Sequence, residues 1–339
     1  MSNPIRIGLF GFGRIGRNIF RLGHNDPRFE FAAISDLGSP EVLHYLLMRD
    51  SVFGPMENDI ILKGNHLIYN EHKTRLIPGG KPGTVTWDAF DVDVVIDCTG
   101  AFRKRADLNK HIKAGAKRVI VSVPPLDKID RIVIPGINEE TISREDSIIS
   151  TTSSTTQVLA LMLKILDEGF GVKQGMMTTI HAYTSDQPLA DAVRSDLRRS
   201  RSAVENIIPN ETWAPEYVSK IMPQFKDKIS GIAFNVPVPN GSCVDLTTEL
   251  DQIPSIEKAN ACVQAAAEKD YNNLIAYTED PIVSSDVIGR EETMIFDAKA
   301  TMIASNQMLK TICWYDNGWG FAKRILEMVD RYRELEALS

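Results

Sequence analysis

The sequence has few cysteines and no long apolar run, and both absences exclude classes of protein. Its four cysteines are scattered along the 339 residues, at positions 98, 243, 262 and 313. No pair therefore has the spacing of a metal site or a redox motif. No apolar run approaches the ~20 residues of a membrane-spanning helix. With no apolar signal after Met1 to Pro4, we expect a cytoplasmic protein that neither crosses a membrane nor binds a metal.

The sequence also lacks an excess of positive charge. A formal net charge of −7 gives no reason to expect nucleic acid or an anionic membrane as a partner, so any anion must be bound by local groups. The content of 43% hydrophobic and 24% charged residues is that of an ordinary globular protein. A chain of this length can form two domains with separate cores.

Residues 5–22 have the pattern of a strand, a glycine turn and a helix. An apolar run, Ile5–Phe10, leads directly into Gly11-Phe12-Gly13-Arg14-Ile15-Gly16. Gly11 permits a tight turn, Gly13 lets the backbone approach a pyrophosphate, and Gly16 lets the helix pack closely on the sheet. This unit predicts a dinucleotide site with the phosphates at the helix N-terminus.

An acidic residue after the next strand indicates which dinucleotide is bound. The strand predicted at Phe29–Ser35 ends in Asp36, twenty residues beyond Gly16. A carboxylate there accepts hydrogen bonds from the adenosine ribose and repels a 2′-phosphate, which favours NAD over NADP. The alternative is that Asp36 only caps a helix that begins near Pro40.

Two later strands end in small residues that could line the same site. The run 92–97 leads into Cys98-Thr99-Gly100, and the run 118–123 ends at Ser122 before two prolines. Ligands bind beyond the carboxyl ends of strands in doubly wound sheets, so Thr99 and Ser122 fit the walls of a nicotinamide cleft. Plain strand-ending turns are the alternative reading.

The pattern changes after Ser150, where predicted strands follow one another with fewer helices between them. We therefore predict an α/β protein in which a doubly wound Rossmann domain, residues 1–152 joined by the C-terminal helix 320–339, precedes an α+β catalytic domain, residues 153–319, on a large mixed sheet. The expected strands of the second domain lie at about 174–184, 229–236, 242–250, 293–299 and 309–315, and its amphipathic helix at 257–269.

Small hydroxyl residues open the first helix of the second domain. Ser153–Thr156 follow a short strand at Ile148–Ile149 and precede apolar residues with helical spacing. A helix N-terminus suits a nucleophile, an oxyanion or a phosphate, although a serine and threonine cap explains the same residues. His181, on the next predicted strand, could serve as the base for a nucleophile there.

The loop 184–208 carries four arginines in an otherwise acidic protein. They are Arg194, Arg198, Arg199 and Arg201. Such a loop is either a solvated surface or a contact for phosphate or for another subunit.

Several runs, in order from 11–18 to Trp314-Tyr315-Asp316-Asn317, resemble phosphorylating glyceraldehyde-3-phosphate dehydrogenase over the whole chain. The active-site match is Ser153-Ser154-Thr155-Thr156 followed by His181-Ala182-Tyr183-Thr184. The resemblance implies a homotetramer that binds a phosphorylated aldehyde, inorganic phosphate and NAD. In that family a cysteine thiolate adds to the aldehyde, a hydride passes to NAD, and phosphate cleaves the thioester.

The resemblance also implies a role for each matching residue. His181 would be the base, Ser154 would take the place of the nucleophile, and Asn317 would hold the nicotinamide. The other implied cofactor residues are Gly11, Gly13, Arg14, Ile15, Gly16, Asp36, Thr99 and Ser122, and the implied substrate or phosphate residues are Ser153, Thr155, Thr184, Arg198, Thr212 and Asn235.

The sequence departs from the family pattern at functional positions. Ser154 stands where the family has cysteine, which predicts much slower turnover and indicates either an engineered change or natural divergence. Asn235 replaces an arginine and Trp213 a glycine at the phosphate sites, so the substrate or acyl acceptor could differ. Ala192 and Val193 replace Leu-Pro near the adenosine ribose, which leaves NADP open.

Two other functions remain as alternatives. Asp191-Ala192, the run 196–199 and Pro223-Gln224-Phe225 partly resemble erythrose-4-phosphate dehydrogenase, whereas the run 181–184 favours the triose enzyme. A non-catalytic, nucleotide-binding member of the family would also explain Ser154, Asn235 and Trp213.

Overall fold

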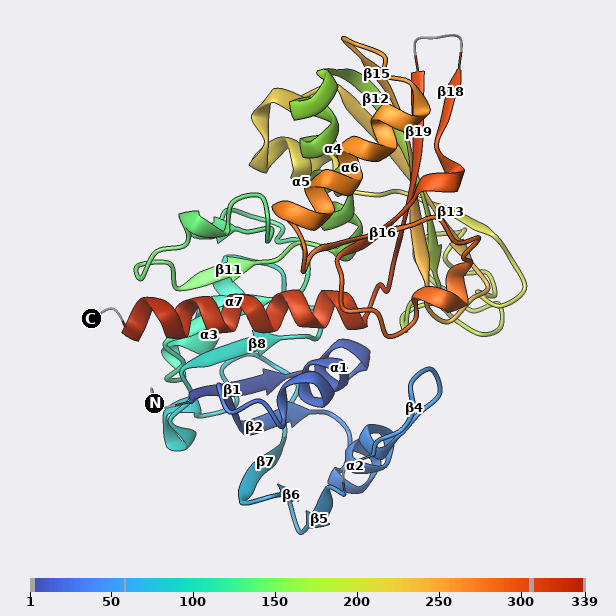
Figure 1. Cartoon of the computed structure of the whole chain (residues 1–339). Coiled ribbons are helices and arrows are strands. Elements are labelled where there is room, and N and C mark those ends of the chain that lie inside the picture. Colours follow the sequence, from blue (N-terminus) through green and yellow to red (C-terminus); the bar gives the residue numbers. More distant parts are fainter. Residues whose placement is uncertain (1–3, 58, 305–307, 338–339) are drawn as a thin grey trace. The chain divides into compact units, whose positions relative to one another are not determined.

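The computed structural model describes residues 4–57, 59–304 and 308–337, and the chain folds as two compact units (Figure 1). Unit 1 is formed by residues 1–133, 138–152 and 322–339, and unit 2 by residues 134–137 and 153–321. Each unit contains one large sheet and its own buried apolar core.

The sheet of unit 1 has the order β10-β11-β9-β8-β1-β2-β7-β6-β5. All pairs from β10 to β7 are parallel, and β6 and β5 continue the sheet as antiparallel hairpins. Because β1 lies between β2 and β8, the chain winds to opposite sides of β1. Ligands bind beyond the carboxyl ends of strands at such a switch point. The strands are β1 (Ile5–Phe10), β2 (Phe29–Asp36), β5 (Ile61–Lys63), β6 (His66–Tyr69), β7 (His72–Pro78), β8 (Val94–Asp97), β9 (Arg118–Val121), β10 (Arg131–Ile132) and β11 (Ile148–Ser150), with a separate pair, β3 (Arg49–Asp50) and β4 (Gly54–Pro55).

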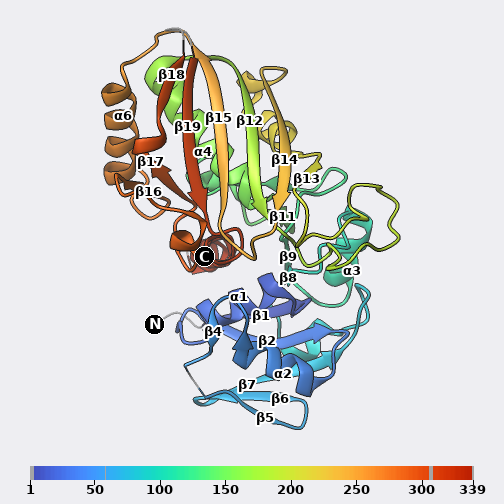
Figure 2. The same ribbon diagram turned by 90° about the vertical axis from the view of Figure 1, so that its right-hand side faces the viewer.

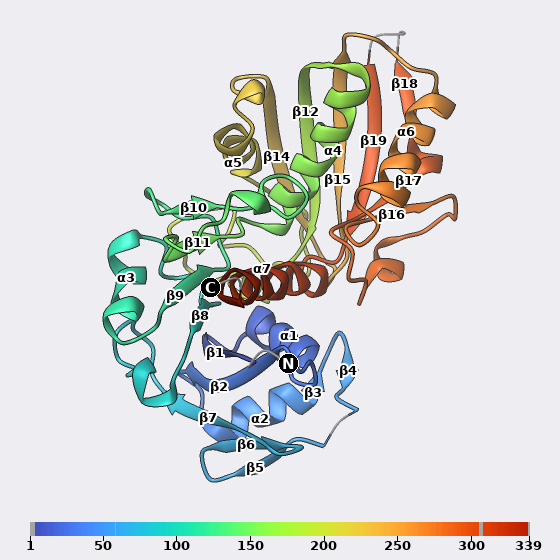
Figure 3. The same cartoon turned by 60° about the vertical axis from the view of Figure 1, so that its left-hand side comes forward.

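Helices cover both faces of this sheet. Leu108 of α3 is buried in a cluster with strand residues such as Phe10 and Val119 on one face. Helices α1 and α7 lie together on the other face, where an added Cβ on Gly23 would be 3.3 Å from Leu326 (Figure 3). The helices of this unit are α1 (Arg14–Gly23), α2 (Pro40–Met48), α3 (Arg105–Lys113) and α7 (Trp319–Ala337), with a 3-10 turn η1 (Trp87–Phe90).

The large sheet of unit 2 is mixed. Its order is β13-β14-β12-β15-β19-β17-β16, with β18 paired to β19. The pair β12 and β14 is parallel, whereas β15 runs antiparallel to both β12 and β19. The strands are β12 (Val172–Ala182), β13 (Ile208–Asn210), β14 (Ile229–Val236), β15 (Ser242–Leu250), β16 (Ile275–Thr278), β17 (Met294–Asp297), β18 (Met302–Ala304) and β19 (Met308–Tyr315); the helices are α4 (Ser154–Phe170), α5 (Ala214–Ile221) and α6 (Ile256–Lys269).

The two faces of this sheet differ in their cover. Figures 2 and 3 show α4, α5 and α6 on one face, and their apolar side chains form one buried cluster with the strands. Side chains alternate along each strand, so Met177 points into this core while its neighbour Met176 is 70% exposed. The second face carries no helix among the described residues of unit 2, and Ile232 and Met308 are exposed on it as well.

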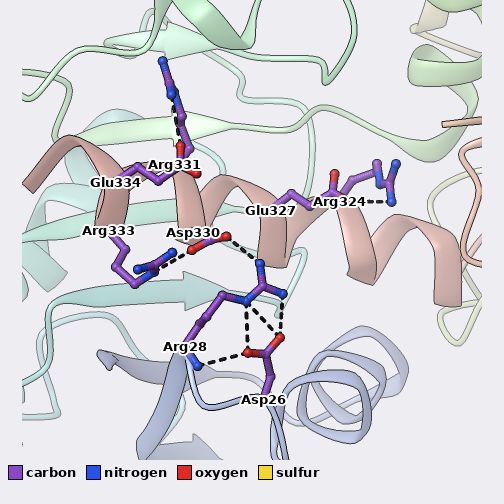
Figure 4. A network of polar contacts seen from close by, with 8 residues as sticks. All are labelled: Asp26, Arg28, Arg324, Glu327, Asp330, Arg331, Arg333 and Glu334. Atoms are coloured by element: carbon purple, nitrogen blue, oxygen red, sulfur yellow. Dashed lines mark hydrogen bonds and ion pairs between the residues drawn. The ribbon is translucent and has the colours of Figure 1, made fainter. Parts of the chain in front are cut away.

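Charged residues join α7 to the start of β2 in unit 1 (Figure 4). Arg28 Nη1 donates to Asp330 at 2.6 Å and Arg28 also contacts Asp26, while Arg333 Nε donates to Asp330 at 2.6 Å. Hydrogen bonds from Arg28 lower the pKa of Asp26, and those from Arg28 to Asp26 raise the pKa of the guanidinium. Asp330 therefore accepts from two arginines on different elements. By contrast, Glu334 pairs with Arg331 within α7.

We expect Asp330→Ala to lower the free energy of unfolding by about 1 kcal/mol, because it leaves Arg28 and Arg333 without their shared acceptor in a partly exposed network. The matched control is Glu334→Ala, which removes one exposed pair within a helix and should cost at most a few tenths of a kcal/mol. Urea unfolding of the three proteins measures both changes. Equal effects of the two substitutions would contradict this role of Asp330.

Candidate functional site

The glycine turn after β1 places each glycine for a different reason. Gly11 has φ +95°, and an added Cβ would be 2.9 Å from the backbone nitrogen of Thr99. A Cβ on Gly16 would be 2.3 Å from the carbonyl oxygen of Gly11, so only glycine lets α1 start so close to β1. A Cβ on Gly13 would meet no atom within 4 Å. Gly13 is thus the glycine that keeps space free at the N-terminus of α1.

Asp36 is fixed at the end of β2 by two backbone amides. Its Oδ2 accepts from Phe12 N at 2.6 Å and its Oδ1 from Gly38 N at 3.0 Å. The helix-cap alternative is wrong, because Ser39 caps α2 by accepting from Val42 N. The carboxylate therefore lies beside the glycine turn, where it suits ribose hydroxyls and disfavours an added phosphate.

A pocket of about 310 Å³ lies beside Asp36 and the glycine turn. Backbone edges and apolar rings surround it, and burial raises the pKa of the Cys98 thiol that lines it. Together with the open position at Gly13, these groups fit the adenosine end of a dinucleotide. The lining residues are Phe10, Gly11, Gly13, Ser35, Asp36, Leu37, Gly79, Gly80, Cys98, Thr99, Ala101 and Phe102.

Gly13→Ala and Gly16→Ala should separate binding from folding. Gly13→Ala should fold like the unchanged chain but bind NAD at least tenfold more weakly, because the methyl group occupies the space through which phosphates approach the backbone. Gly16→Ala should lower the unfolding temperature, because its methyl group collides with a backbone oxygen. Calorimetric titration with NAD and thermal unfolding measure the two effects. Undiminished NAD affinity in Gly13→Ala would place the phosphates elsewhere.

In unit 2, Ser153 caps α4 and Ser154 is its first residue. Ser153 Oγ accepts from Thr156 N at 3.2 Å. The preceding residue, Thr152, has φ +62°, a left-handed conformation that is strained for a β-branched side chain. Such strain is typical of functional sites. The predicted helix start is confirmed. The first backbone N–H groups of α4 therefore lie beside Ser154.

His181 lies near the end of β12, and its tautomer follows from one hydrogen bond. Its Nδ1 is 2.7 Å from the carbonyl oxygen of Ala182. A carbonyl oxygen only accepts, so Nδ1 carries a proton, and in the neutral ring the lone pair is then on Nε2. Nε2 is therefore the atom that can act as a base.

Tyr315 joins the start of α4 to the end of β12. Its hydroxyl contacts Thr155 Oγ1 at 2.7 Å and Thr179 Oγ1 at 3.0 Å, and its ring packs edge-on against His181 with centroids 6.1 Å apart. Burial raises the pKa of Tyr315 to about 12, so the hydroxyl stays neutral and can both donate and accept. No role is predicted for Tyr315 from the sequence, although it lies in a run that carries the resemblance.

Ser242 extends this network to Asn317. Its hydroxyl accepts from Ala182 N and donates to Asn317 Oδ1, each at 3.0 Å, and it also hydrogen bonds to Tyr315. Asn317 Oδ1 is thereby engaged within unit 2, which fixes the direction of the amide. One buried set of hydroxyls thus orients the helix start, the histidine strand and the asparagine.

Three of the residues expected to bind substrate or phosphate, Thr184, Arg198 and Thr212, lie on the loops that follow β12 and β13. Thr184 Oγ1 donates to Asp186, which also pairs with Arg199. Burial acts to raise the pKa of Asp186, but these two contacts outweigh burial and lower the pKa. Arg198 is exposed, with its backbone N donating to Asp196, and Thr212 Oγ1 accepts from Ala214 N. Arg199 rather than Arg198 is therefore connected to Thr184, through Asp186.

Asn235 is turned inward at the position where the resemblance implies an arginine. On β14 it pairs in register with His181, and its Nδ2 donates to Ala182 O at 3.3 Å. Asn210 of β13 donates in turn to Asn235 Oδ1. The carbonyl of Ala182 therefore accepts from both Asn235 and His181, so the Asn235 amide supports the acceptor of His181 instead of offering a positive charge.

Comparisons with known proteins identify the family of the chain. Residues 5–105 match the family described as glyceraldehyde 3-phosphate dehydrogenase, NAD binding domain, and residues 153–317 match its C-terminal domain. The chain belongs to the glyceraldehyde-3-phosphate dehydrogenase family. It is 41% identical to glyceraldehyde-3-phosphate dehydrogenase 1 of Bacillus subtilis over 325 residues, 96% of this chain and 97% of the relative.

Two further relatives bear the name glyceraldehyde-3-phosphate dehydrogenase. The one from Geobacillus stearothermophilus is 40% identical over 325 residues, and the one from Mycobacterium leprae is 40% identical over 332 residues; each match covers 96% of this chain and 97% of the relative. Membership in this family, with its NAD-binding domain, makes NAD the cofactor. Within residues 4–57, 59–304 and 308–337, no helix is long and apolar enough to cross a membrane, and no group of three or more acidic, histidine or cysteine side chains could hold a metal ion.

Proposed function

We propose that the chain catalyses NAD-dependent oxidation of glyceraldehyde 3-phosphate, with inorganic phosphate, to 1,3-bisphosphoglycerate. The main support is Tyr315, which ties the helix start at Ser154 to the strand that carries His181, so that a nucleophile position and a base belong to one rigid network. The family's domains, which span both units, support the same reaction.

Each residue of the site has a role that follows from its chemistry. His181 Nε2 takes the proton of the nucleophile at position 154, and its Nδ1 stays bonded to Ala182 O, which holds the ring in place. The first N–H groups of α4 stabilise the oxyanion that forms when the aldehyde is attacked. NAD, when bound, would supply the acceptor for the hydride of the substrate. Gly13 and Asp36 position the adenosine and phosphates, and Ser242 orients the amide of Asn317.

Ser154 makes this form of the chain a slow enzyme. A serine hydroxyl loses its proton far less readily than a thiol, and the resulting ester resists cleavage by phosphate more than a thioester does. Cys243 does not replace Ser154 as the nucleophile. It pairs in register with Ile180, the residue before His181, but burial raises the pKa of the Cys243 thiol to about 12. The other three cysteines also have pKa values raised by burial.

We expect Ser154→Cys to raise the rate of NADH formation by at least a hundredfold, because a thiolate then forms beside a histidine and a helix N-terminus. The assay contains glyceraldehyde 3-phosphate, NAD and phosphate. Adding His181→Asn to Ser154→Cys should remove most of the gain, because an asparagine side chain cannot take up the thiol proton. Rapid turnover by the unaltered chain would contradict the proposed effect of Ser154.

The same assay distinguishes the alternatives. Erythrose 4-phosphate as the better aldehyde for the cysteine variant would favour the related dehydrogenase. NAD binding without activity in both proteins would favour a non-catalytic member of the family. Asn235 gives these alternatives a physical basis, since the loss of a guanidinium removes a charge-assisted phosphate contact of about 1.5–3 kcal/mol.

We infer a homotetramer, located in the cytoplasm as the sequence predicts. The bare face of the sheet in unit 2 exposes Met176 and Ile232, and the arginine-rich loop exposes Leu189, Val193 and Leu197. Exposed apolar side chains on one face are typical of an interface with another chain. The resemblance implies other copies of the same chain as partners.

Light scattering should give a mass of four times the 37.8 kDa of one chain. Ile232→Glu should reduce the mass, because it places a charge on the bare face, whereas Lys258→Glu on the exposed side of α6 should leave it unchanged. A monomer for the unaltered chain would contradict the proposed assembly.

A further inference from the structure

A chain of buried polar groups lies behind the cofactor pocket in unit 1. It runs from Trp87 in η1 through His111 on α3 to Asp97 at the end of β8, and all three side chains are 0% exposed. Buried polar groups cost stability unless they are paired, so three in a row require a reason. None of them contributes to the mechanism described above.

The partners of His111 fix its tautomer. Trp87 Nε1 donates to His111 Nδ1 at 3.1 Å. An indole N–H can only donate, so Nδ1 must carry a lone pair and the proton lies on Nε2. Nε2 lies 3.6 Å from Asp97 Oδ2, slightly beyond hydrogen-bond length, and neither atom has a hydrogen-bond partner among the described residues. His111 is therefore a neutral donor directed at the Asp97 carboxylate.

The other oxygen of Asp97 builds the turn that lines the pocket. Its Oδ1 accepts from Thr99 N at 2.9 Å and from Thr99 Oγ1 at 2.6 Å, and Thr99 Oγ1 accepts from Ala101 N at 3.2 Å. Thr99 and Ala101 both line the pocket. The turn also abuts the glycine turn, since a Cβ on Gly11 would collide with Thr99 N. The direction of the Asp97 carboxylate therefore sets one wall of the cofactor pocket.

An aromatic contact connects His111 to the same wall. Its ring packs edge-on against Phe10 with centroids 4.7 Å apart, and the ring centroids of Phe10 and Phe102 are 6.1 Å apart. Phe10 and Phe102 line the pocket as well. His111 thus touches the wall through Asp97 and through Phe10 without lining the pocket itself.

We propose that His111, held by Trp87 in the tautomer with the proton on Nε2, is a positioning residue for NAD: it orients Asp97 and through it the turn at Thr99. His111 does not contact the cofactor. Its effect is on the affinity for NAD and not on the chemical step. This role depends on the cofactor and not on which aldehyde is oxidised.

The test compares His111→Leu with His111→Gln in the full chain. Leucine fills a similar volume but can neither accept from Trp87 nor donate to Asp97, whereas a glutamine amide can do both. Calorimetric titration with NAD, below the unfolding temperature of each variant, should give an affinity about tenfold weaker for leucine and within about twofold of the unaltered chain for glutamine. Unchanged affinity in a folded, less stable His111→Leu protein would show a purely structural role and overturn the proposal.

A second set of variants tests the tautomer. In Asp97→Asn, the amide oxygen can still accept from Thr99 when the amide nitrogen faces His111. The amide nitrogen and His111 Nε2 are then two donors that face each other, so NAD affinity should fall about tenfold. Adding Trp87→Phe frees Nδ1 to carry the proton, lets Nε2 accept from the new amide nitrogen at position 97, and should recover most of the affinity. A double variant that binds NAD no better than Asp97→Asn alone would overturn the proposal.

In the unaltered chain, ¹⁵N NMR of the imidazoles should show His111 protonated on Nε2. Protonation on Nδ1 would contradict the proposal even if the variants fail to fold.

In the background of Ser154→Cys, the same substitution of His111 should separate binding from chemistry. His111→Leu should raise the KM for NAD about tenfold and leave kcat within about twofold. A fall in kcat at an unchanged KM would contradict a role in cofactor positioning.

Discussion

The candidate site of unit 2 depends on one buried hydroxyl, that of Tyr315. A phenol removed from water must satisfy its hydroxyl with protein groups, and here Thr155, Thr179 and Ser242 supply them. These partners come from α4, β12 and β15, so satisfying one oxygen fixes the relative position of three elements. The start of α4 and the end of β12 cannot shift independently without leaving that oxygen unpaired. The orientation of Ser154 and His181, the proposed nucleophile position and base, is therefore part of the fold.

The sequence predicted well those features that local chemistry determines. β1 and β14 begin and end at the predicted residues, because each is an uninterrupted run bounded by turn residues. The helix that starts at Ser154 was predicted from its cap and from the spacing of apolar residues, and the structure confirms it. The carboxylate at Asp36 likewise follows from a fixed spacing to the glycine turn. In each case residues within about twenty positions carry the information.

Features that depend on pairing between distant residues were not predictable in the same way. His111 and Asp97 each read as ordinary polar residues in their own segments, and only the packing of α3 on the sheet brings them together. Tyr315 follows the alternation of buried and partly buried side chains along β19, like any strand residue. Asn210 and Asn235 gave no signal of pairing, because β13 is only three residues long and follows an irregular loop. A single sequence contains these residues but not their neighbours.

The inward Asn235 shows why a lost phosphate contact need not damage the base. An arginine at this register would be drawn to an anion, and the carbonyl of Ala182 would then accept from His181 alone. With asparagine, the short amide reaches that carbonyl and is itself held by Asn210, so the hydrogen-bond acceptor of His181 is fixed from two sides. Substrate recognition is affected instead, since the region proposed to bind phosphate has one cation fewer. In this chain the site keeps an oriented histidine, and we propose that selectivity for a phosphorylated substrate rests on Thr184, Thr212 and the arginine-rich loop.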